Sequence, residues 1–121
     1  MKKILVVDDN VVNLKVVDKI LKVNEDYKPV LIPSGKKALQ FLEKNVPDLI
    51  LLDVLMPEMD GFEVLTAIRS NPDLADVAVL FLTAEEDSAL KEKIKAAGAQ
   101  GCLLKPFDKD DLLKLVAQHL A

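Results

Sequence analysis

The chain has 121 residues, half of them hydrophobic and 30% charged, with a net charge of −4. This length predicts one domain whose core needs no structural metal, and the single cysteine, Cys102, cannot form an internal disulfide. The acidic balance disfavours nucleic acid as a direct partner, and no apolar run reaches the roughly 20 residues of a membrane span. The apolar run at 4–7 is also too short for a secretory signal, so we expect a cytoplasmic protein.

Strands and helices are predicted to alternate along the whole chain. Apolar runs that end in polar residues indicate strands at 4–7, 30–32, 49–52, 77–82 and 102–104. Apolar residues at helical spacing predict helices that begin after Asn10, Ser34 and Asp60, at 87–97, and at Asp108. This alternation indicates a parallel sheet with helices on both faces, and Pro29 at the start of the second strand favours an edge position.

Four of the five predicted strands end in a polar side chain suited to phosphate or metal chemistry. The first ends at Asp8 and Asp9, the third at Asp53, the fourth at Thr83 and the fifth at Lys105. Each residue alone has a simpler interpretation, such as a helix cap, a turn or a solvated surface. Because parallel strands bring their carboxyl ends to one edge, where open α/β sheets bind ligands, the coincidence favours a site.

Three converging carboxylates repel one another unless a cation joins them. Mg²⁺ suits such hard oxygen ligands and often bridges carboxylates to a phosphoryl group, which a lysine and a hydroxyl could bind from the other side. Asp53, at the end of a continuous apolar run, is therefore the candidate acceptor of a phosphoryl group. The few glycines permit neither a G-x-G-x-x-G nor a P-loop motif, and the sole histidine, His119, is too near the end of the last helix for a Ser/His/Asp triad.

The motifs at these positions closely resemble those of a response-regulator receiver domain, over 2–121. They are Asp8-Asp9-Asn10, Asp53-(x)₂-Met56-Pro57-x-Met59-Asp60-Gly61, Thr83-Ala84 and Lys105-Pro106-Phe107. The resemblance implies a single receiver domain over 1–121 with a flavodoxin-like fold. In that fold, a three-layer α/β sandwich, five helices cover a five-stranded parallel sheet of order 2-1-3-4-5.

The resemblance also implies a role for each residue of the site. Asp53 would accept the phosphoryl group from a phosphohistidine. The ligands of Mg²⁺, or of Mn²⁺ in its place, would be Asp8, Asp9, Asp53 and the backbone carbonyl of Leu55. The residues that bind the phosphoryl oxygens and switch with them would be Thr83, Ala84 and Lys105. The residues that shape the surrounding loops would be Pro57, Gly61 and Pro106, the last after a cis peptide bond.

The implied donor is a sensor histidine kinase or a histidine phosphotransfer protein. The implied recipient of the signal is a downstream protein target or an attached output domain, so the chain is expected to be regulatory rather than an enzyme, apart from assisting its own phosphorylation and slow dephosphorylation. Both a stand-alone receiver and a fragment of a longer regulator stay open. Val11, Val12 and Leu14 are expected to be mostly core, with one or two exposed to meet the donor.

The sequence departs from the family pattern at two places. Cys102 stands where receivers usually carry an aromatic residue, which leaves the coupling of Thr83 to the output open; a small buried hydrophobe is favoured over a redox or ligand role. The second place is Leu55 and Glu85, because in the family these two positions flank the path of the water that hydrolyses the acyl phosphate. Because an apolar Leu55 cannot orient that water, we expect slow self-dephosphorylation.

Two other functions fit parts of the pattern less well. A Mg²⁺-dependent phosphatase with an aspartyl nucleophile usually carries a D-x-D pair, whereas Asp53 is followed by Val54 and Leu55, and the chain has no room for a cap domain. A degenerate receiver that acts only as a protein-binding module would not need the complete set of acids, threonine and lysine.

Overall fold

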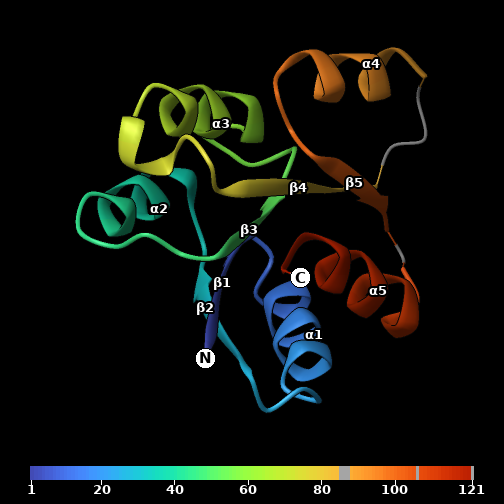
Figure 1. Cartoon of the computed structure of the whole chain (residues 1–121). Coiled ribbons are helices and arrows are strands. Elements are labelled where there is room, and N and C mark those ends of the chain that lie inside the picture. The colour runs from blue at the N-terminus through green and yellow to red at the C-terminus, as the bar shows by residue number, and fades with distance from the viewer. Residues whose placement is uncertain (85–87, 106, 121) are drawn as a thin grey trace.

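The computed structural model describes residues 1–84, 88–105 and 107–120. Its strands are Lys2–Val7 (β1), Tyr27–Ile32 (β2), Leu49–Asp53 (β3), Ala78–Thr83 (β4) and Gly101–Leu104 (β5). All pair in parallel in one sheet of order β2-β1-β3-β4-β5 (Figure 1). This order confirms the predicted flavodoxin-like sheet, and every strand delivers its carboxyl end to the same edge.

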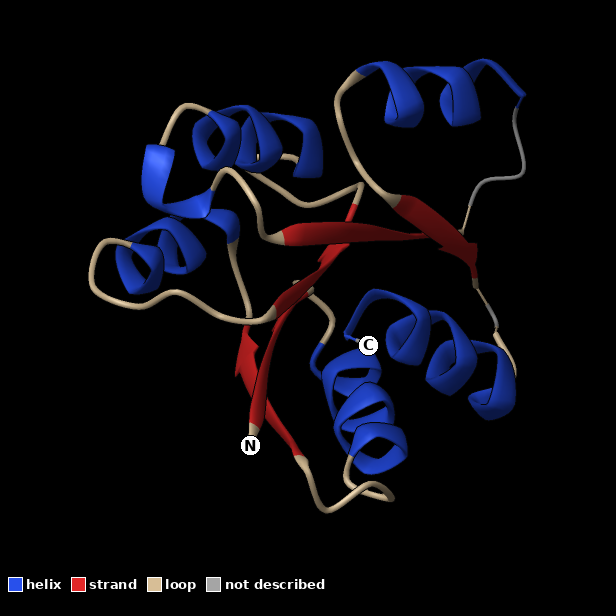
Figure 2. Cartoon of the chain, viewed as in Figure 1, coloured by secondary structure: helices blue, strands red, loops and turns tan. Residues whose placement is uncertain are grey.

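The helices are Val11–Leu21 (α1), Gly35–Leu42 (α2), Gly61–Arg69 (α3), Ser88–Ala96 (α4) and Lys109–Leu120 (α5). They form two layers, one on each face of the sheet (Figure 2). One apolar cluster joins the sheet to α2, α3 and α4, and a second joins it to α1 and α5. In the described part of the chain, no helix combines the length and the apolar character needed to cross a bilayer.

The central strand β3 is buried along its whole length. Leu49 and Leu51 face the α1–α5 layer, whereas Ile50 and Leu52 face the α2–α4 layer. A strand covered on both faces needs apolar side chains at every position, which explains the continuous apolar run in the sequence. Asp53 is the only residue of this strand that is not apolar, and it is the last residue of the strand.

Side-chain caps set where three of the helices begin, as predicted. The side chains of Asn10 and Ser34 accept backbone N–H groups at the starts of α1 and α2. Asp60 forms a capping box with Glu63 at the start of α3. These caps fix the chain directly after β1 and before α3, next to the edge where the acids lie.

Strand β2 is longer than predicted, because it begins at Tyr27 rather than near Val30. Pro29 therefore lies inside the strand, opposite Ile4, and not at its start. The predicted edge position is confirmed, since β2 pairs with β1 alone. A proline is tolerated there because one side of an edge strand has no partner strand for its missing N–H.

Other boundaries also differ from the prediction. Helix α2 ends at Leu42, well before Pro47. A short 3₁₀ helix at Pro72–Leu74 was not predicted, although Asn71 caps it. The acids at 85–87, expected in the first turn of the fourth helix, lie outside the described residues.

The exposed face of α1 is more apolar than predicted. Val11 and Val12 are 54% and 67% exposed, whereas Leu14 is buried. The expectation that one or two of these residues are exposed is confirmed, and the expectation that most of them belong to the core was wrong. The buried stripe consists of Leu14, Val17 and Leu21, which repeat at helical spacing. Val11 and Val12 fall outside that stripe and face away from the sheet.

Candidate functional site

Three carboxylates meet at the carboxyl edge of the sheet. Asp8 and Asp9 directly follow β1, and Asp53 ends the neighbouring strand β3. One oxygen from each lies within 4.8 Å of the others. Asp8 and Asp53 are only 1% and 7% exposed, whereas Asp9 is open to solvent. The cluster therefore offers closely spaced oxygen ligands with one exposed side, a donor set that suits Mg²⁺.

Lys105, the residue directly after β5, joins this cluster. Its Nζ atom lies 2.8 Å from Oδ2 of Asp8 and 3.3 Å from Oδ1 of Asp53. The other carboxylate oxygen of Asp8 accepts the backbone N–H of Asn10 at 2.9 Å. The backbone N–H of Lys105 donates to the carbonyl oxygen of Thr83, which ties the end of β5 to the end of β4. The lysine thus balances part of the charge of two buried acids.

The environment of Asp53 raises the pKa of its carboxyl group from 3.8 to about 6. Burial is the main cause, followed by repulsion from Asp8, while the charge of Lys105 acts in the opposite direction. A second cation at the cluster would relieve the repulsion and lower this pKa. Asp53 is therefore an ionised group at neutral pH that still lacks full charge compensation.

The loop at 54–60 is pinned to the strand that carries Asp53. Gly61 donates its N–H to the carbonyl oxygen of Val54 at 2.8 Å. A Cβ atom on Gly61 would collide with the carbonyl oxygen of Asp53 and would lie 2.7 Å from the ring of Phe81. Within the loop, Glu58 adopts a φ of 67°. Only glycine permits the close approach at position 61, which sets the course of the backbone past Leu55.

The end of β4 lies beside the acids. Thr83 is 5% exposed and is the last residue of β4, next to the end of β3 in the register of the sheet. Ala84 follows and lines a groove of about 450 Å³ that also includes Val16, Lys105 and Phe107. The groove therefore runs between Lys105, which contacts the acids, and Val16 on the exposed side of α1.

Residues 4–117 match the family model described as the response regulator receiver domain. The chain belongs to this family. Receiver domains are the regulatory domains of two-component systems, and they interact with histidine kinases or phosphotransfer proteins.

Relatives and solved structures support the same assignment. The chain is 37% identical, over 99% of its length, to a segment of hybrid signal transduction histidine kinase B of Dictyostelium discoideum. That segment makes up 7% of the kinase. The chemotaxis protein CheY4 of Vibrio cholerae shares its fold with a TM-score of 0.92, 36% identity and 99% coverage of both chains. The receiver domain of the sensor histidine kinase PA1611 of Pseudomonas aeruginosa has a TM-score of 0.89 and 29% identity, with 98% of this chain and 97% of that one covered.

The receiver brings together the acids and the lysine that the sequence analysis singled out. Pro57 and Leu55 are exposed in the loop after β3, with the Leu55 side chain 59% exposed. Pro106, with the peptide bond before it, and Glu85 lie outside the described residues. His119 is far along α5, where Nδ1 lies 3.0 Å from the carbonyl oxygen of Leu115, consistent with a structural role.

Cys102 is half-buried rather than fully buried. It packs against the α2–α4 layer of the receiver, and in the sheet it pairs with Phe81 of β4. Sequence reasoning missed two contacts in this region. The ring of Phe81 packs against the ring of Phe62 of α3, and Lys93 of α4 lies over the Phe62 ring. No motif marks these residues, because an apolar strand residue and one of several helix lysines carry no signal of their contact.

Proposed function

We propose that Asp53 accepts a phosphoryl group from a phosphohistidine. The observation that carries the proposal is the buried carboxylate of Asp53 at the end of β3, near the carboxylates of Asp8 and Asp9 and 3.3 Å from Nζ of Lys105. Attack by an oxygen of Asp53 forms the O–P bond, while the N–P bond breaks and its electron pair returns to the histidine ring. The protein mainly positions the groups and balances charge, as is general in phosphoryl transfer.

The carboxylates would hold Mg²⁺, or Mn²⁺ in its place, together with the backbone carbonyl of Leu55. The close spacing of the three acids supports this ligand set, as does the magnesium ion in the active-site cleft of the related PA1611 receiver. When bound, the ion would neutralise charge on the acids and on the phosphoryl oxygens. Asn10 positions Asp8 through its backbone N–H, and so contributes without being a ligand.

Lys105 would exchange its contact with Asp53 for one with a phosphoryl oxygen. The Thr83 hydroxyl and the backbone of Ala84 would bind the others, since Thr83 ends β4 and Ala84 follows it at the same edge. Pro57, Gly61 and Pro106 would keep the loops in shape around the group. The arrival of a dianion at the ends of β3 and β4 would then change the surface near α4.

The donor would be a sensor histidine kinase or a histidine phosphotransfer protein that docks beside the site. Exposed Val11 and Val12 and the groove at Val16 form an apolar surface there. The recipient would be a downstream protein or an attached output domain, and the cytoplasm is the expected compartment. In the hybrid kinase relative, a segment similar to this chain makes up 7% of the protein, which is compatible with an attached output domain.

The test is incubation with acetyl phosphate and Mg²⁺ followed by intact mass. We expect one phosphoryl adduct that is absent in Asp53→Asn and after chelation with EDTA. Asp48→Asn is the matched control, because Asp48 is an exposed acid just before β3, where it accepts the backbone N–H of Lys3. Turnover of acetyl phosphate without a retained adduct would favour the phosphatase. No adduct and no turnover would favour a receiver that only binds proteins.

A further inference from the structure

Helix α4 is held in place by few buried side chains. Ile94 is 3% exposed, and Leu90 is half-buried against the same apolar cluster. The other described side chains of this helix are exposed, among them Lys91, Lys93 and Lys95. A helix with so little buried apolar surface is at the low end of local stability. Its position therefore depends on a small number of specific contacts.

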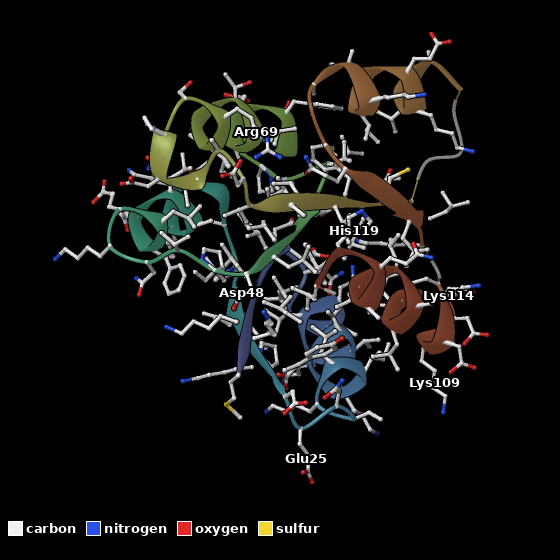
Figure 3. All side chains as sticks on the ribbon, viewed as in Figure 1. Glu25, Asp48, Arg69, Lys109, Lys114 and His119 are labelled. Atoms are coloured by element: carbon white, nitrogen blue, oxygen red, sulfur yellow. The ribbon has the colours of Figure 1, made fainter. Side chains whose placement is uncertain are left out.

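The carboxyl end of α4 is anchored by Arg69, the last residue of α3. The guanidinium donates to the carbonyl oxygen of Gly98 at 3.1 Å and to Oε1 of Gln100 at 2.8 Å. It also donates to the carbonyl oxygen of Val77 at 3.0 Å, at the start of β4. Figure 3 shows the Arg69 side chain extending from α3 toward β4. These charge-assisted hydrogen bonds fix the turn after α4 to α3 and to the sheet.

The middle of α4 rests on an aromatic pair that leads back to the site. Nζ of Lys93 lies 4.4 Å from the centroid of the Phe62 ring. The Phe62 ring packs on Phe81 of β4, with centroids 5.2 Å apart and planes inclined by 48°. Gly61, next to Phe62, lies so close to Phe81 and to the carbonyl of Asp53 that no side chain fits between them. Direct contacts therefore run from the end of β3 to Lys93.

Strand β5 carries no aromatic residue that could take over this contact. Cys102, the β5 partner of Phe81, is small and half-buried in the same apolar cluster. The ring that α4 covers thus belongs to Phe62 of α3, whose position depends on the loop that begins at Asp53. A change at the end of β3 can reach α4 without any side chain of β5.

We propose that α4 is a lever, pivoted at the Arg69 anchor, whose middle is released from Phe62 when Asp53 carries a phosphoryl group. This inference rests on the proposed function. A cation is attracted to a ring only within about 6 Å of its centroid. Because the present distance is 4.4 Å, a shift of Phe62 by roughly 2 Å ends the contact. An exposed contact of this kind changes an equilibrium only by a factor of about two to five, so it can form and break reversibly. We call this contact between Lys93 and Phe62 the latch. Phe62 and Lys93 are positioning residues in this mechanism.

Amide hydrogen exchange in α4 tests the latch. The protein is compared alone and with Mg²⁺ and beryllofluoride, a stable mimic of the phosphoryl group. We expect the amides at 91–94 to exchange about two to five times faster with the mimic, and those at 98–100 to stay unchanged. Lys93→Met keeps the aliphatic stem but loses the charge. This variant should exchange about two to five times faster already without the mimic, which should then add little.

Lys91→Met is the matched control, with the same change of charge on the same helix, and it should behave as the wild type. Two outcomes would contradict the latch. In the first, the mimic binds, as a raised melting temperature shows, but exchange at 91–94 stays the same. In the second, Lys93→Met and Lys91→Met respond alike. Phe62→Leu provides a second variant that keeps apolar packing and removes the ring. It should reproduce Lys93→Met, and normal mimic-dependent exchange in it would also overturn the lever. If the mimic does not bind at all, the acceptor role of Asp53 fails, and the lever fails with it.

Discussion

The edge that holds Asp8, Asp53 and Lys105 and the face formed by α4 and β5 are built in opposite ways. The edge joins two buried acids to Lys105 by contacts of 2.8 Å and 3.3 Å, and β3 and the second half of β1, which lead to those acids, are fully buried. The face consists of a helix with one deeply buried side chain among those that the structure describes and a strand that is half-buried throughout. Chemistry needs groups held in fixed positions, whereas a switch needs an element that moves at low cost. The rigid edge and the weakly held helix meet at Gly61 and Phe62.

The largest expected effect tests how firmly the rigid edge is packed. In Gly61→Ala the new Cβ would collide with the carbonyl oxygen of Asp53 and press on Phe81, and backbone cannot yield as a flexible side chain can. We expect a loss of about 3 kcal/mol in the free energy of unfolding, measured with urea. Thr66→Ala, on the exposed side of the same helix, should cost less than about 1 kcal/mol. Equal costs for the two variants would show that the junction is loosely packed.

The second effect concerns the charge that the edge holds without a metal. The pKa of Asp53 is raised from 3.8 to about 6 in the folded protein, mainly by burial. The folded state thus binds the proton more tightly, so the stability contributed by Asp53 is present below pH 4 and is lost as pH rises through 6. In EDTA, Asp53→Asn should be more stable than the wild type by about 2 kcal/mol at pH 7, with a difference that shrinks toward pH 4.

Urea unfolding of both proteins across this pH range makes the measurement. Asp76→Asn removes an exposed acid before β4 and should change stability by less than about 0.5 kcal/mol at any pH. A wild type more stable than Asp53→Asn at pH 7 would mean that Lys105 over-compensates the cost of burying Asp53, and that the edge is relaxed without a cation.

The third prediction separates donor docking from the chemistry at the edge. Val12 is 67% exposed near the site, and Val23 is 72% exposed beyond the other end of α1. We expect Val12→Gln to slow phosphoryl transfer from a phosphorylated histidine phosphotransfer protein about tenfold, or about 1.4 kcal/mol, because buried apolar area is lost in the complex. Labelling by acetyl phosphate should be unchanged, and Val23→Gln should match the wild type in both assays. A slower reaction with acetyl phosphate as well would place Val12 in the chemistry instead.

Sequence reasoning succeeded where one local pattern dictates the result. The continuous apolar run of β3 is dictated by burial on both faces, and Asn10 and Asp60 act locally as helix caps. The acids and Lys105 could be brought together from sequence because parallel strands share one edge. The share of Val11, Val12 and Leu14 that is buried was overestimated because α1 is apolar on more than one face, so periodicity alone did not identify the buried face.

The contacts of α4 could not be predicted in the same way. Lys93 is one of three lysines on α4, and only the packing of α3 against the sheet decides which of them covers Phe62. Arg69 gives no sequence signal either, because its partners at Gly98 and Gln100 are remote in the chain and most of its acceptors are backbone carbonyls. Contacts made by chain segments from different layers depend on the whole fold rather than on a local pattern.

The smallest expected effect concerns the lifetime of the phosphoryl group at the rigid edge. Leu55 is 59% exposed at the mouth of the site and carries no group that could orient an attacking water. Leu55→Asn adds an amide there, and we expect the adduct to be lost about three times faster, a small part of what a positioned catalytic group can contribute. The adduct is followed by intact mass after acetyl phosphate is removed, with Glu58→Gln, an exposed change in the same loop, as control. Equal or slower loss in Leu55→Asn would mean that residue 55 does not control access of water, and that the lifetime is set instead by how tightly Lys105 and the neighbouring backbone enclose the group.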